Sequence, residues 1–243
     1  MALFKSKQAM WTTVGLGGCL GLILLVVVIF LGARAWSRLQ DGDLDADDRM
    51  TEVSDDEASD EEDDDGPGVP TVTFVNDRSR LTGGKAEHFV DFTFDYPASW
   101  AQLEDGTGDD QNFVKVERQT EDEFTIENFA VGWFAGMTPG MAAVQVEGLT
   151  AAGFPEYQKG ADETTLVAGR MAQGFRFSAR LAETPRGPID IWGRMLFVPV
   201  SETNGVVLTL LVSGLSEDVH GPSDVGEAGE LPVILQSFRF GGN

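Results

Sequence analysis

The sequence is poor in the residue types that most often carry catalysis or bind metals. It has a single cysteine, Cys19, and two histidines, His88 and His220. One cysteine cannot form a disulfide within the chain, and there is no cysteine cluster that would bind zinc or an iron–sulfur centre. The sequence contains no Walker loop, GxGxxG motif, HExxH motif or nucleophile elbow. We therefore assign no catalytic, cofactor-binding or metal-binding residue.

Basic residues are also scarce, and the charge is unevenly distributed. The chain has 17 Lys and Arg residues against 40 Asp and Glu residues, a net charge of -23. Residues 1–40 hold four basic and no acidic residues, residues 41–65 hold fifteen acidic and one basic, and residues 66–243 hold 25 acidic and 12 basic. Without a basic patch the chain would repel a phosphate backbone, so nucleic acid is excluded as an expected partner.

One long apolar run lies near the N-terminus. Residues 14–33, VGLGGCLGLILLVVVIFLGA, include no charged residue, and Trp11 and Trp36 stand on either side of the run. A helix of this length spans roughly 30 Å, the thickness of the hydrocarbon core of a bilayer. The pattern predicts a short tail over residues 1–13 and a single transmembrane helix over residues 14–35.

The fate and orientation of this segment have alternatives. Ala33 and Ala35 would suit a signal-peptidase site, but the apolar run exceeds the roughly 7–15 residues of a cleaved signal peptide. An uncleaved signal anchor is favoured, and the short N-terminus places the C-terminal domain outside the cytoplasm. Gly17 and Gly21 form a GxxxG motif, which would allow a homodimer through the membrane helix, although glycine is also common in membrane helices that do not pair.

The acidic segment that follows has the spacing of a calcium loop. In the stretch DGDLDADDRMTE, residues 41–52, acidic residues occupy positions 1, 3, 5, 7 and 12 of an EF-hand frame. However, Ala46 stands where the turn glycine is needed, Asp48 replaces an apolar residue, and no amphipathic helix follows. High like charge with few apolar residues predicts disorder. Residues 36–70 are therefore expected to form a disordered acidic linker.

Residues 71–243 are expected to form one domain, which is large enough to bury a core. Alternating apolar residues predict strands at 172–183, 189–200 and 205–214, joined by the turns TPRGP and Asn204-Gly205 into an antiparallel meander. Residues 124–134 carry large apolar side chains on both faces, which is typical of a central strand. Helices are expected at 140–153 and 228–240. The predicted fold class is α+β: an antiparallel sheet flanked by helices in an α/β/α sandwich.

Each helix has an apolar stripe that we expect to face the sheet. The stripe of the first helix consists of Met141, Val144, Gly148 and Leu149, and that of the second consists of Leu231, Ile234, Leu235 and Phe238. Pro232 suits the first turn of the second helix.

Short motifs give the domain a family resemblance. Tyr96-Pro97 with Trp100 follows the strand beginning at residue 92, and Ser237-Phe238 lies near the end of the chain. With the helix, meander and terminal helix between them, residues 72–240 resemble the PsbP-like family. Its relatives include an extrinsic photosystem subunit, a Ran-binding factor and bacterial envelope proteins of the LpqN and DcrB type. The resemblance implies a non-enzymatic binding or assembly role and transfers no site residue.

Two functions follow as expectations. The first is a non-catalytic, single-pass membrane protein of the cell envelope whose domain binds a protein partner or assembles a complex. The alternative is a carrier or sensor that binds an apolar ligand between sheet and helices, near Trp133 and Trp192. His220 and the acidic residues 109, 110 and 121–123 are expected to lie in solvated loops.

Overall fold

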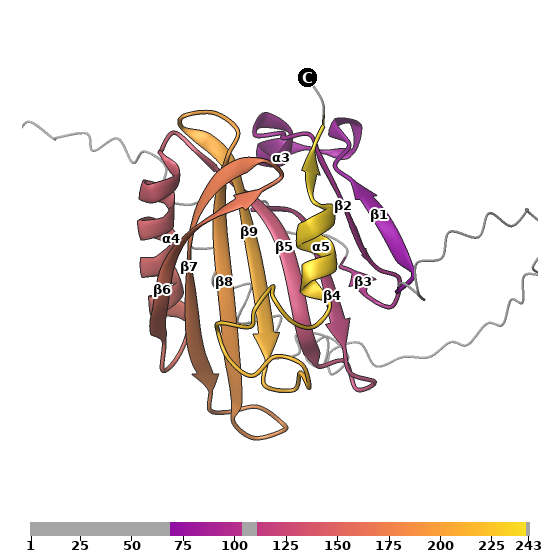
Figure 1. Ribbon diagram of the computed structural model, residues 1–243, viewed down its shortest axis with the longest axis vertical. Helices are drawn as coiled ribbons and strands as arrows, with labels where there is room; N and C mark the ends of the chain where they lie inside the picture. The colour runs from indigo at the N-terminus through magenta and orange to yellow at the C-terminus, as the bar shows by residue number, and fades with distance from the viewer. Residues whose placement is uncertain (1–68, 104–110, 242–243) are drawn as a thin grey trace, which may run out of the picture.

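The computed structural model describes residues 69–103 and 111–241 (Figure 1). The predicted transmembrane helix over 14–35, the dimer motif of Gly17 and Gly21, and all but the last two residues of the 36–70 linker lie outside the described residues. Within the two described ranges, no helix is long and apolar enough to cross a bilayer. Membrane anchoring, linker disorder and the 41–52 loop therefore remain predictions.

The larger of two sheets has seven strands, all paired antiparallel. In spatial order these are β3 (Ala101–Gln102), β4 (Asn112–Gln119), β5 (Thr125–Ala135), β9 (Asn204–Ser213), β8 (Ile189–Pro199), β7 (Arg170–Leu181) and β6 (Gln158–Val167). The β7–β8–β9 meander is confirmed.

The smaller sheet was not predicted. It consists of β1 (Thr71–Val75), β2 (Phe92–Pro97) and β10 (Arg239–Phe240), with β2 in the middle. Between β1 and β2 lie a 3₁₀ turn (Arg78–Arg80) and the short α3 (Gly83–Glu87).

Three layers result. The helix α4 (Pro139–Gly153) covers one face of the larger sheet, and the helix α5 (Leu231–Ser237) together with the smaller sheet covers the other (Figure 1). The α+β class with antiparallel strands is confirmed, but one outer layer of the expected sandwich is part helix and part sheet.

The larger sheet separates two apolar cores. Phe129 and Val131 of β5 are fully buried under the smaller sheet and α5, whereas Phe134 of the same strand packs on the side of α4. This confirms β5 as a strand buried on both faces. On β7, Phe175 and Phe177 are buried and Arg176 is turned to the opposite face, as the alternation predicts.

The motifs behind the family resemblance have structural roles at the smaller sheet. Trp100 is buried just after the end of β2, and its indole N–H donates to the Glu230 carboxylate. The hydroxyl of Ser237 accepts a hydrogen bond from the backbone N–H of Asp95 at 2.8 Å and donates to the Asp95 carbonyl at 3.1 Å. Phe238 is buried against Phe92. These contacts fasten the C-terminal segment to β2.

Two predicted element boundaries are wrong. The C-terminal helix ends at Ser237, because residues 239–240 instead pair with β2. Asn204 and Gly205 do not form the β8–β9 turn: both are strand residues, and Gly205 pairs with Pro199. A side chain at Gly205 would overlap the Phe134 ring, so glycine is required there by close packing and not by turn geometry.

Candidate interaction surface

The predicted ligand groove near Trp133 and Trp192 is not formed by these two residues together. Both lie on the face covered by the smaller sheet and α5, but Trp133 pairs with Val206 and Trp192 with Val212. Six positions along β9 correspond to roughly 20 Å. Trp133 instead stacks on His88, with ring centroids 5.5 Å apart, and on Phe113 at 5.1 Å.

The other residues considered from sequence lie apart from one another. His88 follows α3, and the N–H of His220 donates to the Asp224 carboxylate at 3.0 Å within a loop. Asp122, in the exposed turn 121–123, is paired with Arg186, which holds the pKa of its carboxyl well below the usual value. Positions 109 and 110 lie outside the described residues. Among the residues that are described, no three His, Cys, Asp or Glu side chains form a metal-binding group.

Most charge near the core is paired internally. Arg176 and Arg194 face each other across β7 and β8, and Glu163 of β6 and Glu227 of the 214–230 loop complete a four-residue ion cluster. Arg194 binds Glu163 in bidentate fashion, at 2.8 and 3.0 Å, and Glu227 at 2.9 Å. Two guanidiniums and two carboxylates leave this cluster with no net charge.

The ion cluster also positions the 214–230 loop over the sheet. One guanidinium nitrogen of Arg176 donates to the carbonyls of Pro222, Ser223 and Val225 at 2.7–2.9 Å. A pocket of about 320 Å³ lies beside the cluster, between α5 and the β6–β7 turn. Because Arg194 and Glu227 in its wall are paired with each other, the pocket offers no unpaired charge of theirs to a ligand.

A second buried group of charges ties the other end of this loop to β4 and β5. Arg118 donates to Glu127 at 3.2 Å, and the backbone N–H of Glu230 donates to the same carboxylate at 3.4 Å. Glu127 is fully buried, and this burial raises the pKa of its carboxyl despite the nearby Arg118. Both ion groups therefore hold the loop to the sheet.

The face of α4 that points to solvent is apolar. The prediction that the apolar stripe of this helix faces the sheet is wrong, because the side chains of Met141 and Val144 are 63% and 72% exposed. The helix contacts the sheet instead through small side chains, with Ala142 and Thr150 buried. Large rings in the sheet below, such as Phe175, occupy the space that a larger helix residue would need.

Beside α4 lies the long edge strand β6, which sequence analysis did not predict. Its segment, QKGADETTLV, is exposed along most of its length and lacks apolar alternation, so only Thr164 and Thr165 before Leu166 hinted at a strand. Leu166 pairs with Met171 of β7, and these two side chains are 68% and 58% exposed.

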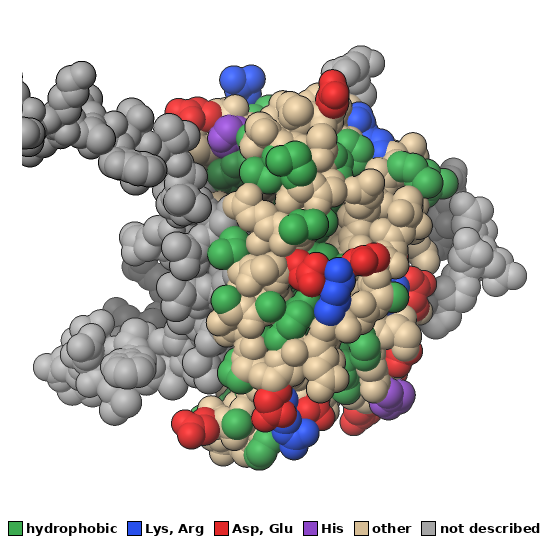
Figure 2. Space-filling model, turned by 90° about the vertical axis from the view of Figure 1, so that its left-hand side faces the viewer, with side chains coloured by type: hydrophobic (Ala, Val, Ile, Leu, Met, Phe, Trp, Pro, Cys, Tyr) green, Lys and Arg blue, Asp and Glu red, His purple; other side chains and the backbone are tan. Residues whose placement is uncertain are grey.

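A groove of about 250 Å³ runs between α4 and β6. Gly140 and Val144 form its helix side, and Thr164 with Gln173 forms its sheet side, next to the Leu166–Met171 pair in register. We call the groove, together with the exposed apolar side chains of Met141, Val144, Leu166 and Met171 on the elements beside it, the α4–β6 surface. Figure 2 shows this side of the domain, with hydrophobic side chains spread around a small group of charged ones.

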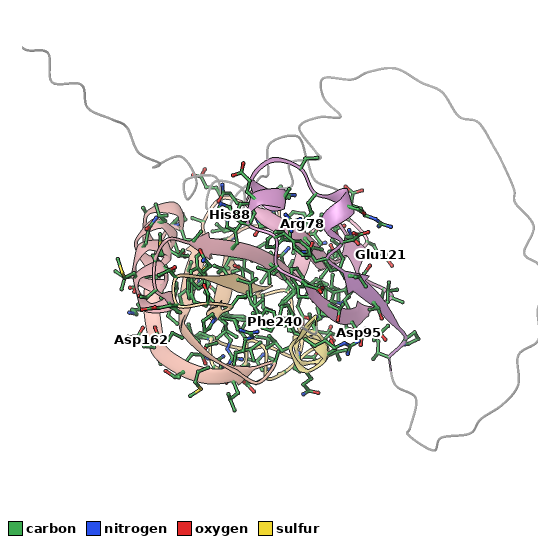
Figure 3. All side chains as sticks on the ribbon, turned by 90° about the horizontal axis from the view of Figure 1, so that it is seen from above. Arg78, His88, Asp95, Glu121, Asp162 and Phe240 are labelled. Atoms are coloured by element: carbon green, nitrogen blue, oxygen red, sulfur yellow. The ribbon has the colours of Figure 1, made fainter. Side chains whose placement is uncertain are left out.

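The charged group in the groove is a triad. Lys159 of β6 contacts both Glu147 of α4 and Asp162 of β6 at 2.8 Å. Both hydrogen bonds raise the pKa of Lys159. Asp162 points outward on the side of the domain away from Asp95 (Figure 3). The triad bridges helix and strand and leaves one negative charge in excess at the groove.

Comparisons with known proteins give likeness of fold only. No protein-family model and no curated protein matches the chain. Among solved structures, one match is LpqN of Mycobacterium tuberculosis, described as involved in cell envelope biogenesis: 10% identity, TM-score 0.43, covering 62% of this chain and 83% of LpqN. Another is cyanobacterial PsbP of Synechocystis sp. PCC 6803: 11% identity, TM-score 0.39, covering 72% and 95%. The predicted PsbP-like resemblance is thereby confirmed, and at these TM-scores nothing further is taken from it.

Proposed function

We propose that the chain is a non-catalytic membrane-anchored protein whose domain binds another polypeptide beside the membrane. The α4–β6 surface carries this proposal. Four large apolar side chains, each more than half exposed, lie on α4 and at the β6–β7 end of the sheet, and one of them, Val144, lines the groove between α4 and β6. Exposed apolar side chains beside a groove are typical of interaction sites.

The internal charge pairing supports a binding role over a catalytic one. The carboxylate of Glu127, which is fully buried, is held by Arg118, and that of Glu163, which is 17% exposed, is held by Arg194. Acid–base catalysis needs titratable groups that converge on space that a substrate can enter. The residues that line the groove between α4 and β6 include one lysine, Lys159, which is already paired, and no histidine.

The carrier alternative has no comparable support. Neither the pocket beside the ion cluster nor the α4–β6 groove is lined by Trp133 or Trp192. Their rings pack against the core instead. We therefore do not carry the alternative further.

Photocrosslinking in native membranes tests the binding function. A photoreactive amino acid is placed at Val144 in the full chain, with a matched variant at Val72, which is 43% exposed on β1 and outside the α4–β6 surface. We expect one discrete adduct from position 144 that is absent from position 72. No adduct at 144, or the same adducts at both positions, would contradict the proposal.

Anchoring is a separate part of the proposal, and it rests on residues 14–35 and the acidic linker. We expect alkaline carbonate to leave the chain in the membrane pellet. We also expect protease added outside the cytoplasmic membrane to degrade the domain. A mature N-terminus at Trp36 would show a cleaved signal peptide and refute the anchor.

A further inference from the structure

The edge strand β6 has no neighbour on its outer side among the described residues. It pairs with β7 alone, at the end of the seven-stranded sheet. A register shift between Lys159 and Asp162 interrupts the ladder, and from Asp162 to Val167 the pairing is continuous. Six consecutive residues therefore form a regular open edge, long enough to pair with a short extended segment.

The geometry of the β6–β7 turn determines which backbone groups face outward. Ala168 and Gly169 have φ of 49° and 75°, so they form a two-residue hairpin turn whose flanking residues, Val167 and Arg170, are hydrogen-bonded to each other. Hydrogen-bonded and non-hydrogen-bonded pairs alternate along an antiparallel ladder. The N–H and C=O groups of Leu166 and Thr164 therefore point away from β7, to the open edge.

The α4–β6 surface lies directly beside these outward groups. The side chains of Thr164 and Leu166 share the sheet face that α4 covers, as do those of Gln173 and Met171 opposite them. A strand added to β6 would direct every second side chain toward the groove, where Val144 provides the helix wall. Backbone pairing and apolar contact are thus available to the same segment.

The acidic charge of the domain and of the groove indicates which kind of segment would bind there. Residues 66–243 carry 25 acidic and 12 basic residues. In the groove itself, Glu147 and Asp162 share the single cation Lys159. A second copy of the chain would bring the same acidic excess, so self-pairing at this edge is electrostatically opposed. A segment with basic residues would find complementary charge.

We propose that β6 binds an extended segment of a partner polypeptide that adds to the sheet as an eighth strand and carries both apolar and basic residues on the one face that it turns to the groove. Its backbone pairs with Thr164 and Leu166, its apolar side chains lie against Val144 and Leu166, and its basic side chains meet Asp162 and Glu147. This mode of binding rests on the proposed polypeptide-binding function and names its site and partner class.

The test uses peptide probes and the full chain in detergent. The cationic probe is an amidated seven-residue peptide with a fluorophore at its N-terminus, in which valine and lysine take turns at every second position with threonine between them, so that both residue types share one face of the strand. A glutamate-for-lysine peptide and a proline-for-valine peptide are the controls for charge and strand pairing. Binding is measured by fluorescence anisotropy at low and high salt, and amide hydrogen exchange is followed at Thr164 and Leu166.

Two variants separate the backbone contribution from side-chain effects. Thr164→Pro removes one outward N–H and leaves the bonds to β7 in place, as proline at a sheet edge allows. Thr164→Val keeps the amide. We expect the cationic probe to bind, to protect the Thr164 and Leu166 amides, and to bind about tenfold more weakly to T164P while T164V changes its affinity less than about twofold. The two control peptides should bind at least about tenfold more weakly.

The outcomes distinguish this inference from the proposed function. Equal binding by T164P and T164V, no added protection on β6, or equal binding of the glutamate peptide would overturn strand addition. If the discrete Val144 adduct in membranes persists in such a case, the binding function stands and only its mode is wrong. If T164P removes that adduct and T164V retains it, strand addition is supported in the membrane as well.

Discussion

The four-residue ion cluster allows a sharp test of what holds the 214–230 loop to the sheet. We consider the substitution of Arg194 by methionine, which retains most of the length of the side chain and removes its charge. The Arg194 side chain is 6% exposed and makes three hydrogen bonds to Glu163 and Glu227. Removal of one partner of a fully buried pair costs about 3–5 kcal/mol, chiefly because the remaining charge is left buried. Here the remaining carboxylates of Glu163 and Glu227 are 17% and 59% exposed, which lowers that cost.

The structure places the expected cost near the lower end of that range. After the substitution, Arg176 still contacts Glu163 at 3.5 Å and Glu227 at 3.1 Å. We therefore expect R194M to lower the free energy of unfolding by about 3 kcal/mol, which lowers the Tm by roughly 6–12 °C in a domain of this size. The measurement is urea and thermal unfolding of the full chain in detergent, followed by tryptophan fluorescence.

A surface pair on the same two strands provides the control. Arg180 and Asp190 are 3.0 Å apart, with side chains 46% and 48% exposed. Exposed pairs contribute about 0–1 kcal/mol, so R180M should have little effect. The double substitution E163M/R194M removes both charges of this pair and should regain about half or more of the loss. A cost for R194M no greater than that for R180M, or a double variant less stable than R194M, would refute the reasoning.

Three further predictions concern single side chains. Because burial raises the pKa of Glu127, the folded state favours the protonated carboxyl. The resulting contribution to the free energy of unfolding is fully present below the usual pKa of 4.5 and is lost as the pH rises through the higher folded-state pKa. The unfolding free energy of wild type relative to E127Q should therefore fall from acid to neutral pH; a constant difference would contradict this. Gly205→Ala forces a methyl group against Phe134 and should lower the free energy of unfolding in urea by about 1–3 kcal/mol. Gly148→Ala has open space around it in α4 and should raise the free energy of unfolding by up to about 1 kcal/mol. Similar effects of the two substitutions would count against the packing argument. Burial raises the pKa of the Tyr157 hydroxyl to about 12, and this hydroxyl has no hydrogen-bond partner among the described residues. Y157F should therefore leave the free energy of unfolding unchanged or raise it by up to about 1 kcal/mol. A clear loss of stability would mean that the hydroxyl does make a hydrogen bond.

The sequence predicted the strands whose alternation reflects burial on one or both faces. The buried side chains of these strands, such as Phe175 and Phe177 on β7 and the apolar residues on both faces of β5, form the patterns that predict them. The edge strand β6 gives no such signal, because little of it is buried. It is a strand by virtue of its pairing with β7, which a local pattern does not encode.

The candidate site was missed for a related reason. Hydrophobicity alone placed Met141 and Val144 toward the sheet, whereas the sheet below is filled by phenylalanine rings. The helix buries the small side chains of Ala142 and Thr150 against these rings, with Ala143 and Val146 partly buried beside them. The Thr150 hydroxyl donates to the Val146 carbonyl. The direction of an apolar stripe thus depends on the volume already occupied by the opposite layer. The sequence shows the apolar stripe, but the local sequence pattern does not reveal how much volume the opposite layer already occupies.

The smaller sheet has a consequence for the order in which the domain folds. Its central strand β2 pairs on one side with β1, which begins at Thr71, and on the other with β10, which ends at Phe240. Contacts between segments so distant in sequence close large loops and form slowly. During synthesis, one edge of β2 therefore remains unpaired until residues 239–240 have left the ribosome. A variant truncated before β10 would retain an open edge on β2.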